Sequence, residues 1–318
     1  ALKSPCWSAV TEDDRAGHQR VPYEQSGFST ILSFFLGIVP MLTGSTATLT
    51  ISRRIIFATL MTLLLLPFSA SAAALRIAGT GNALGTMRLM GEAFTKLHPE
   101  TTVIVLDSIG TSGAIRAVPK GAIEIGLSSR LPKDEEARDG MTTVEYARSP
   151  TVFAVASANA VASITLAQVA DIYSGKLTTW PDGTKIRPVM RQPGDDNTRQ
   201  IARLSPAIEQ ALAAAEKRTG LTYAATDQEA ADKVQHVSGS IGVTTIALIR
   251  SENRSLRPLA LDGVEPSLEN LSAGRYPMVK HFYLVLPKEP TPAAKEFLQF
   301  MRSPQGRRIL EENGHLVP

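Results

Sequence analysis

The sequence is poor in the residues from which most catalytic and metal centres are built. Its 318 residues include one cysteine, Cys6, so neither an intrachain disulfide nor a cysteine-rich metal site can form. The five histidines stand far apart, at His18, His98, His236, His281 and His315. They show no HxxxH or HxH spacing, which argues against a dedicated zinc site, and the GxSxG motif of serine hydrolases is missing. We therefore expect no metal and no other cofactor.

The sequence also lacks an excess of charge of either sign. Its 33 basic and 30 acidic residues give a formal net charge of +3. Lysine and arginine form no run longer than a pair, so the chain has no sign of a nucleic-acid-binding surface. With 43% hydrophobic and 20% charged residues, the composition is that of a globular protein with one large or two modest domains.

A hydrophobic stretch begins well inside the chain. Residues 53–72 read RRIIFATLMTLLLLPFSASA, which combines two arginines, an apolar core and a small-x-small cleavage site. The core has about 14 residues, fewer than the ~20 that span a bilayer. An uncleaved anchor is the alternative, because residues 28–43 are also apolar. We expect a secretory signal peptide, cut after Ala72, and residues 1–52 to be an upstream extension that is either unstructured or not native. A mature chain without cysteine suits the periplasm.

From residue 75 onward, short apolar runs alternate with helical patterns. Strands are expected at 75–78, 102–106, 123–127, 152–156, 186–190, 239–244 and 281–286. Helices are expected at 84–97, 110–118, 165–175, 203–218, 292–301 and 304–312. Thr165 and Gln168 have the spacing of a capping box. Strand–helix alternation of this kind predicts an α/β fold with a largely parallel sheet.

Polar loops follow several of these strands. Three of them, at 79–82, 110–113 and 128–129, are rich in Gly, Ser and Thr, and each leads into a helix. In parallel sheets, ligands bind beyond the carboxyl ends of the strands, where helix N-termini offer free N–H groups to anions. A fourth loop, 191–199, begins with Arg191, which can hold an oxyanion with two N–H groups. The alternative is that these residues only cap helices and form a surface ion pair.

One of the loops also imitates a dinucleotide-binding motif. Gly79, Gly81 and Gly85 follow a strand, and Asp107 ends the next one, about where a ribose-binding acid belongs. A nicotinamide-dependent oxidoreductase is disfavoured, because that cofactor is not expected outside the cytoplasm and the chain carries an export signal. An exported enzyme of another kind would need a catalytic set of residues that the sequence does not show.

Four stretches resemble, in the same order, the signatures of the phosphate-binding periplasmic proteins of ABC transporters. They are VLDSIGTSGAIRAVPKGAIEIGLSSRLPKDEE (105–136), ADIYSGKLTTWPDGTKIRPVMRQPGDDNTR (170–199), GSIGV (239–243) and HFYLVLPKEPTPAAKEFLQFMRSPQGRRILEENG (281–314). The resemblance covers essentially all of residues 75–318. It implies a type II periplasmic-binding fold, with two lobes, each a mostly parallel sheet flanked by helices, joined by two hinge strands around a ligand cleft.

The resemblance also implies domain bounds and a function. Lobe 1 would comprise residues 75–155 and 280–318, and lobe 2 residues 156–279, with crossings near 149–157 and 276–286. The protein would capture a small oxyanion, with phosphate expected, and deliver it as a monomer to a membrane ABC permease without catalysing a reaction. The alternative within the same fold is an oxyanion sensor or receptor that delivers no cargo.

Carried over by position, the resemblance places ligand contacts in the first lobe. The first loop of the family falls on Ala83 and Leu84, which would offer only backbone N–H groups. A hydroxyl-rich loop of the family matches Thr111 and Ser112. The acid that accepts the phosphate proton in the family falls on Ser129, which is a departure from the pattern.

The second lobe departs further. The arginine loop of the family keeps Arg191 here, but Asp195 and Asp196 stand where the family has Ser and Gly donors, followed by Asn197 and Thr198 as further candidates. A carboxylate ~4 Å from a unit negative charge is repelled by about 4 kcal/mol at an effective dielectric near 20, unless it accepts the ligand's proton or pairs with a cation. Either Asp195 or Asp196 takes over the acceptor role, or both point away, or the ligand is not free phosphate.

Overall fold

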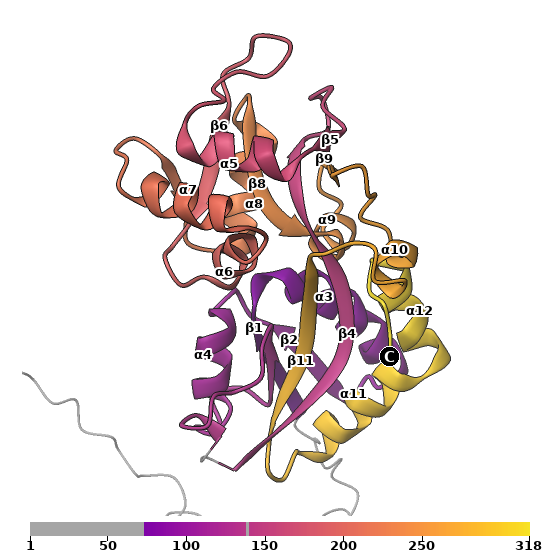
Figure 1. Cartoon of the computed structure of the whole chain (residues 1–318). Helices are drawn as coiled ribbons and strands as arrows, with labels where there is room; N and C mark the ends of the chain where they lie inside the picture. The colour runs from indigo at the N-terminus through magenta and orange to yellow at the C-terminus, as the bar shows by residue number, and fades with distance from the viewer. Residues whose placement is uncertain (1–72, 138–139) are drawn as a thin grey trace, which may run out of the picture. The chain divides into compact units, whose positions relative to one another are not determined.

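The computed structural model describes residues 73–137 and 140–318, so the expected signal peptide at 53–72 and the extension at 1–52 lie outside the described residues. Two groups of strands share one long strand, β4 (Met141–Ala156). Its first half pairs with β11 (Val279–Pro287), and its second half pairs with β8 (Ser240–Thr245) and β9 (Leu256–Pro258). The chain thus passes from one group of strands to the other along β4 and returns along β11 (Figure 1).

The first group of strands runs in the order β2, β1, β3, β11 and β4. Its other members are β1 (Ala73–Gly79), β2 (Thr101–Val105) and β3 (Ile125–Ser128), and its helices are α3 (Gly81–Leu97), α4 (Gly110–Ala117), α11 (Pro292–Arg302) and α12 (Pro304–Glu312). Strand β1 is parallel to β2 and β3, whereas β11 is antiparallel to β3 and β4. Helix α4 covers one face of this sheet, and α11 and α12 lie on the other (Figure 1).

The second group runs from β4 through β8 and β6 to β7. Its further elements are β6 (Arg187–Arg191), β7 (Thr222–Ala224), the short pair β5 (Ser163–Ile164) and β10 (Ala260–Leu261), and the helices α5 (Leu166–Ser174), α6 (Asp196–Ala202), α7 (Pro206–Glu216), α8 (Asp227–His236), α9 (Ile246–Ser251) and α10 (Leu268–Ser272). Strand β6 is parallel to both β7 and β8. The carboxyl ends of β6 and β7 therefore point the same way.

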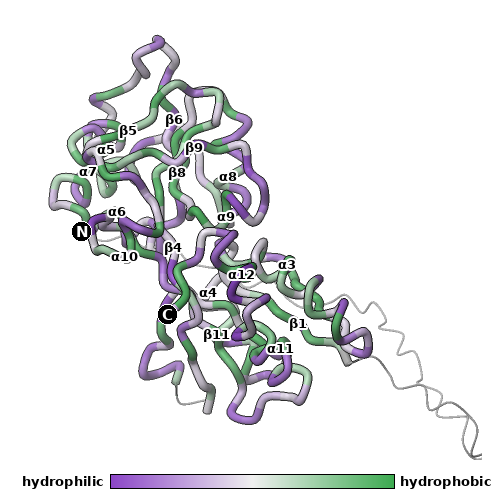
Figure 2. The backbone as a smooth tube through the Cα atoms, turned by 90° about the vertical axis from the view of Figure 1, so that its right-hand side faces the viewer, coloured by the Kyte–Doolittle hydropathy of each residue, from purple (hydrophilic) through white to green (hydrophobic). Residues whose placement is uncertain are grey.

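Each group of strands has its own hydrophobic core. Phe94, Phe282 and Phe297 centre the first core, and Phe153 and Tyr276 belong to the second. The strands β1 and β11 are largely hydrophobic, as a strand buried between helices must be (Figure 2). The predicted α/β fold with two lobes is confirmed, while the lobe bounds at 155/156 and 279/280 stay predictions. Within residues 73–137 and 140–318, none of the helices has the length and hydropathy that a membrane crossing needs.

Two of the expected elements differ in extent. The strand expected at 152–156 is the end of the 16-residue β4, whose earlier residues mix polar and apolar side chains and form no apolar run. The helix expected at 203–218 is the shorter α7, because Ser205 caps its start by accepting the N–H of Ile208 at 3.2 Å. By contrast, the capping box of Thr165 forms as expected, and Gly175 ends α5 with a φ of 82°.

Candidate functional site

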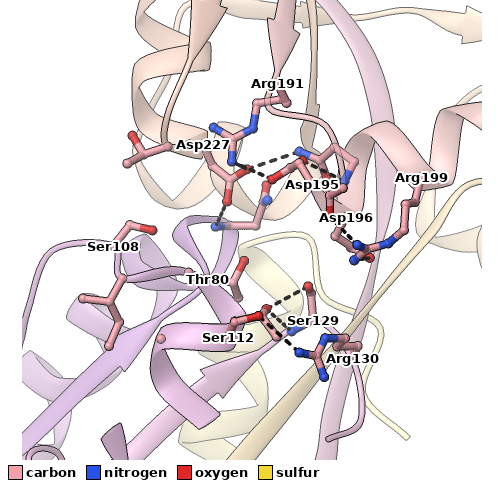
Figure 3. A pocket seen from close by; sticks show the side chains of 18 of the residues that line it. Thr80, Ser108, Ser112, Ser129, Arg130, Arg191, Asp195, Asp196, Arg199 and Asp227 are labelled. Atoms are coloured by element: carbon pink, nitrogen blue, oxygen red, sulfur yellow. Dashed lines mark hydrogen bonds and ion pairs between the residues drawn. The ribbon is translucent and has the colours of Figure 1, made fainter. Parts of the chain in front are cut away.

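A cavity of about 730 Å³ is bordered by the loops that follow the strands of both groups. The first group contributes Thr80, Asn82, Ser108, Thr111, Ser112, Ser129 and Arg130, the second contributes Arg191, Asp195, Asp196, Asn197, Arg199 and Asp227, and β11 contributes Lys280. Figure 3 shows Arg191, Asp195 and Asp227 on one side of the cavity and Ser112 and Ser129 on the other. The cavity is thus a cleft lined almost entirely by polar side chains.

Most of the residues that the sequence pointed to meet in this cleft. The seven that line it are Thr111, Ser112, Ser129, Arg191, Asp195, Asp196 and Asn197. Thr198 does not line it, because α6 has turned its third residue away from the cleft.

The structure places Ala83 and Leu84 outside the lining of the cleft. Both side chains lie in the first hydrophobic core, with 0% and 1% exposure, and the N–H of Ala83 is donated to the carbonyl of Thr80 at 3.2 Å. Leu84 borders only a smaller cavity of about 220 Å³. Thr80, the N-cap of α3, and Asn82, the second residue of that helix, line the cleft instead.

The first lobe presents the start of α4 to the cleft. The helix begins at Gly110, whose φ of +67° suits glycine, and no described side chain caps it. Its first N–H groups and the positive end of its dipole are therefore available to an anion. The hydroxyl of Thr111 accepts the N–H of Ser129 at 3.0 Å and lies 3.0 Å from the Ser129 hydroxyl, which fixes both groups at the cleft wall.

The second lobe presents a buried arginine at the end of β6. The Arg191 side chain is 10% exposed, and its Nη2 lies 2.9 Å from Asp195 Oδ2 and 3.5 Å from Asp227 Oδ1. Its Nε–H has no hydrogen-bond partner among the described residues. Burial alone would lower the pKa of Arg191, but Asp227 and Asp195 outweigh it and raise that pKa. Its Nη1 also donates to the carbonyl of Ala224 at 3.3 Å, and the five N–H donors of the guanidinium exceed the partners that the described residues supply.

Asp227 joins the two lobes at the same place. Its carboxylate accepts the N–H of Asn82, at the start of α3, and the side-chain amide of Asn197, each at 3.2 Å. Burial raises the pKa of Asp227 against the opposing effects of Arg191 and Lys280. The Asp227 carboxylate therefore connects α3 of the first lobe to α6 and β6 of the second.

Asp195 and Asp196 have separate roles. Asp195 is the N-cap of α6 and accepts the N–H of Asn197 at 2.9 Å with Oδ1, while its Oδ2 faces Arg191. Asp196 Oδ2 lies 2.5 Å from Lys280 Nζ, and its Oδ1 lies 3.6 Å from Arg199. Burial would raise the pKa of Asp196, but Lys280 and Arg199 outweigh it and lower that pKa. Both carboxylates are thus paired with cations, which resolves the repulsion expected from the sequence.

The cleft as a whole carries excess positive charge. Its described lining contains three carboxylates, Asp195, Asp196 and Asp227, and seven cationic side chains. The cations are Arg116, Arg130, Lys133, Arg191, Arg199, Arg203 and Lys280. A cleft with walls of one dominant sign concentrates ligands of the opposite sign and accelerates their binding.

Among the lining residues that the sequence analysis did not predict, Asp227 and Lys280 were missed for different reasons. Asp227 follows β7 and begins α8, so it has the same strand–loop–helix position as the residues that were recognised, but β7 is only three residues long. Lys280 stands inside the apolar strand β11, where no local pattern separates it from an ordinary strand residue.

Comparison with known proteins supports a family assignment. A family model described as a PBP superfamily domain matches residues 67–305. The phosphate-binding protein PstS of Bacillus subtilis (strain 168) is 24% identical over 253 residues, which are 76% of this chain and 80% of that protein. PstS 2 of Streptococcus pneumoniae serotype 4 is 32% identical over 106 residues, which are 33% of this chain and 36% of that protein.

Solved structures agree with this assignment. A protein of Clostridium perfringens, described as a phosphate ABC transporter substrate-binding protein with bound phosphate, is 25% identical, with a TM-score of 0.65 over 77% of this chain and 99% of that one. The periplasmic molybdate-binding protein of Azotobacter vinelandii shares the fold, with a TM-score of 0.57 at 16% identity over 77% of this chain and 99% of that one. The resemblance found in the sequence is confirmed, and the chain belongs to the PBP superfamily of periplasmic binding proteins.

Proposed function

We propose that this protein is an exported solute-binding protein that captures phosphate in its cleft for an ABC transporter. The observation that carries this function is that two anion-binding features face each other across the cleft. One is the buried guanidinium of Arg191, and the other is the uncapped start of α4 on the opposite wall. Closure of the two lobes would surround an anion with charged and neutral donors from both sides. The protein acts as a monomer and presents its closed form to a membrane permease.

The named relatives support phosphate over other oxyanions. The curated relatives are called phosphate-binding proteins, and the Clostridium perfringens structure contains phosphate. Those relatives are binding proteins and not enzymes, and no histidine or cysteine lies among the described residues of the cleft. We therefore propose capture and release of the ligand without a chemical step.

Isothermal titration calorimetry of the purified full chain tests the function directly. We expect one phosphate to bind per chain, with sulfate and molybdate binding more weakly. If molybdate bound in preference to phosphate, the assignment of the fold would stand, but phosphate would be the wrong ligand. If none of the three oxyanions released or absorbed heat, a cleft for oxyanion capture would be refuted.

The expected signal peptide at 53–72 predicts the N-terminus of the exported protein. Protein recovered from the periplasm should begin at Ala73 or within two residues of it, because the small-x-small site ends at Ala72. N-terminal sequencing of the secreted material measures this. Periplasmic protein that began at Ala1 or Met41 would contradict cleavage at this site.

A further inference from the structure

Lys280 is a buried cation that neither the resemblance nor the loop pattern assigned to the cleft. It lies on β11 and pairs in register with Ser149 of β4, where the chain passes between the two groups of strands. Its side chain is 2% exposed, yet it lines the cleft. A lysine in this position is not a surface residue that extends into the cleft by chance.

The contacts of Lys280 leave part of its bonding capacity unused. Its ammonium lies 2.5 Å from Asp196 Oδ2 and 2.6 Å from Asn197 Oδ1. An ammonium has three N–H donors, so these two partners leave one donor free among the described residues. Asp196 is also paired with Arg199 at 3.6 Å, so Lys280 is not its only counter-charge. A buried ammonium with an unused donor gains free energy from a further acceptor.

The position of Lys280 is fixed by more than one contact. Gln200, one turn along α6 from Asp196 and Asn197, donates its side-chain amide to the carbonyl of Val279. Helix α6 is therefore held against β11 by the side chain of Gln200 as well as by the side chain of Lys280. A cation fixed in this way does not have to be ordered when the ligand arrives, which favours affinity.

We propose that Lys280 is a direct ligand of the bound phosphate and donates its third N–H to a phosphate oxygen. The inference rests on the proposed function and adds a binding residue from the strand that connects the lobes. The lysine has two effects: it balances Asp196, which would otherwise repel a dianion, and it contributes a charged donor of its own. The position of Lys280 on β11 also joins the ligand to the strand along which the chain returns between the lobes.

A pair of substitutions separates these two effects. Lys280→Met removes the donor and leaves Asp196 less well balanced, so we expect phosphate affinity to fall at least about 100-fold. Asp196→Asn removes the repulsion between this carboxylate and the phosphate. The double variant Lys280→Met/Asp196→Asn contains neither charge, so it has no unpaired acid at this position to destabilise the fold. We expect the double variant to bind phosphate at least about 10-fold more weakly than Asp196→Asn alone. Calorimetric titration with phosphate measures all four proteins, and thermal unfolding checks that each is folded.

A spectroscopic measurement on the unmodified chain provides an independent readout. With 15N-labelled lysine side chains, the buried Lys280 ammonium should give a signal protected from exchange that shifts when phosphate is added and disappears in Lys280→Met. Lys295→Met, which changes an exposed lysine on α11, is the matched control and should bind phosphate as the wild type does. Equal phosphate affinity in Asp196→Asn and the double variant would overturn the inference alone. Failure of the wild type to bind phosphate would overturn the proposed function together with it.

Discussion

Arg191→Ala is expected to abolish tight phosphate binding, with a loss of affinity of at least about 100-fold. Removing one partner of a buried, hydrogen-bonded charge pair typically costs 2–5 kcal/mol, and each 1.4 kcal/mol is a factor of ten. Here the loss is compounded, because the same guanidinium balances Asp195 at 2.9 Å and Asp227 at 3.5 Å. Without it, two carboxylates would face an incoming dianion. Calorimetric titration with phosphate measures the effect.

Three further variants identify the cause of that loss. Arg191→Lys keeps the charge but loses the planar fork, so we expect an intermediate loss of about 10-fold. Arg191→Ala/Asp227→Asn should recover part of the affinity, since one of the two exposed repulsions is gone. Arg187→Ala changes an exposed arginine at the other end of the same strand and should bind phosphate normally. If Arg191→Ala and Arg191→Lys both bound phosphate as tightly as the wild type, the only role of Arg191 would be its structural ion pair with Asp195.

The predicted site residues that line the cleft are those attached to local signals in the sequence. Thr111 lies in the first turn of α4, Ser129 directly follows β3 and Arg191 ends β6, and the carboxyl end of a parallel strand is where ligands bind. The resemblance predicted ligand contacts at Ala83 and Leu84, whereas the residues from this loop that line the cleft are Thr80 and Asn82. A shift of a few residues at a helix start is enough to turn a side chain from the cleft into the core.

The parts that the sequence did not locate depend on contacts far apart along the chain. Lys280 is near Asp196 because β11 and α6 are packed together, which no window of neighbouring residues records. The extent of β4 depends on its antiparallel pairing with β11, and its first half mixes polar and apolar residues without an apolar run. Helix α8 buries mainly Ala230, Ala231 and Val234, so its buried face offers few large apolar residues as a signal. In each case tertiary packing decides the structure.

Phosphate is expected to bind more tightly than sulfate at neutral pH, by the ~1–3 kcal/mol of an unsatisfied buried polar group. Phosphate carries a proton at this pH and sulfate carries none, so an ionised carboxylate in the cleft accepts a hydrogen bond from the first and repels the second. Asp195 and Asp227 both line the cleft, and each accepts hydrogen bonds from the protein with both of its carboxylate oxygens, each of which has a second lone pair for a ligand. We expect Asp227 to be the acceptor, because burial raises its pKa and a more basic carboxylate accepts a proton more strongly.

The pH dependence of the selectivity follows from the direction of that pKa shift. Above its pKa, Asp227 is ionised, accepts the phosphate proton and repels sulfate. As the pH falls through this pKa, which lies above the ordinary value of 3.8, the protonated acid becomes a donor to either anion. Sulfate affinity should therefore rise as the pH is lowered, and the difference between the two anions should shrink. Parallel titrations with phosphate and sulfate from pH 8 to pH 5 measure this.

Substitution identifies which acid recognises the proton. Asp227→Asn should narrow the difference between phosphate and sulfate mainly by admitting sulfate, because an amide offers that anion a donor in place of a negative charge. Asp134→Asn, at an exposed acid outside the cleft lining, should leave the difference unchanged. If Asp227→Asn retains the full selectivity while Asp196→Asn loses it, the acceptor is Asp196, beside Lys280. Equal affinity of the wild type for both anions would show that no carboxylate in the cleft recognises the phosphate proton, and that Asp227 serves to hold the start of α3 against the second lobe.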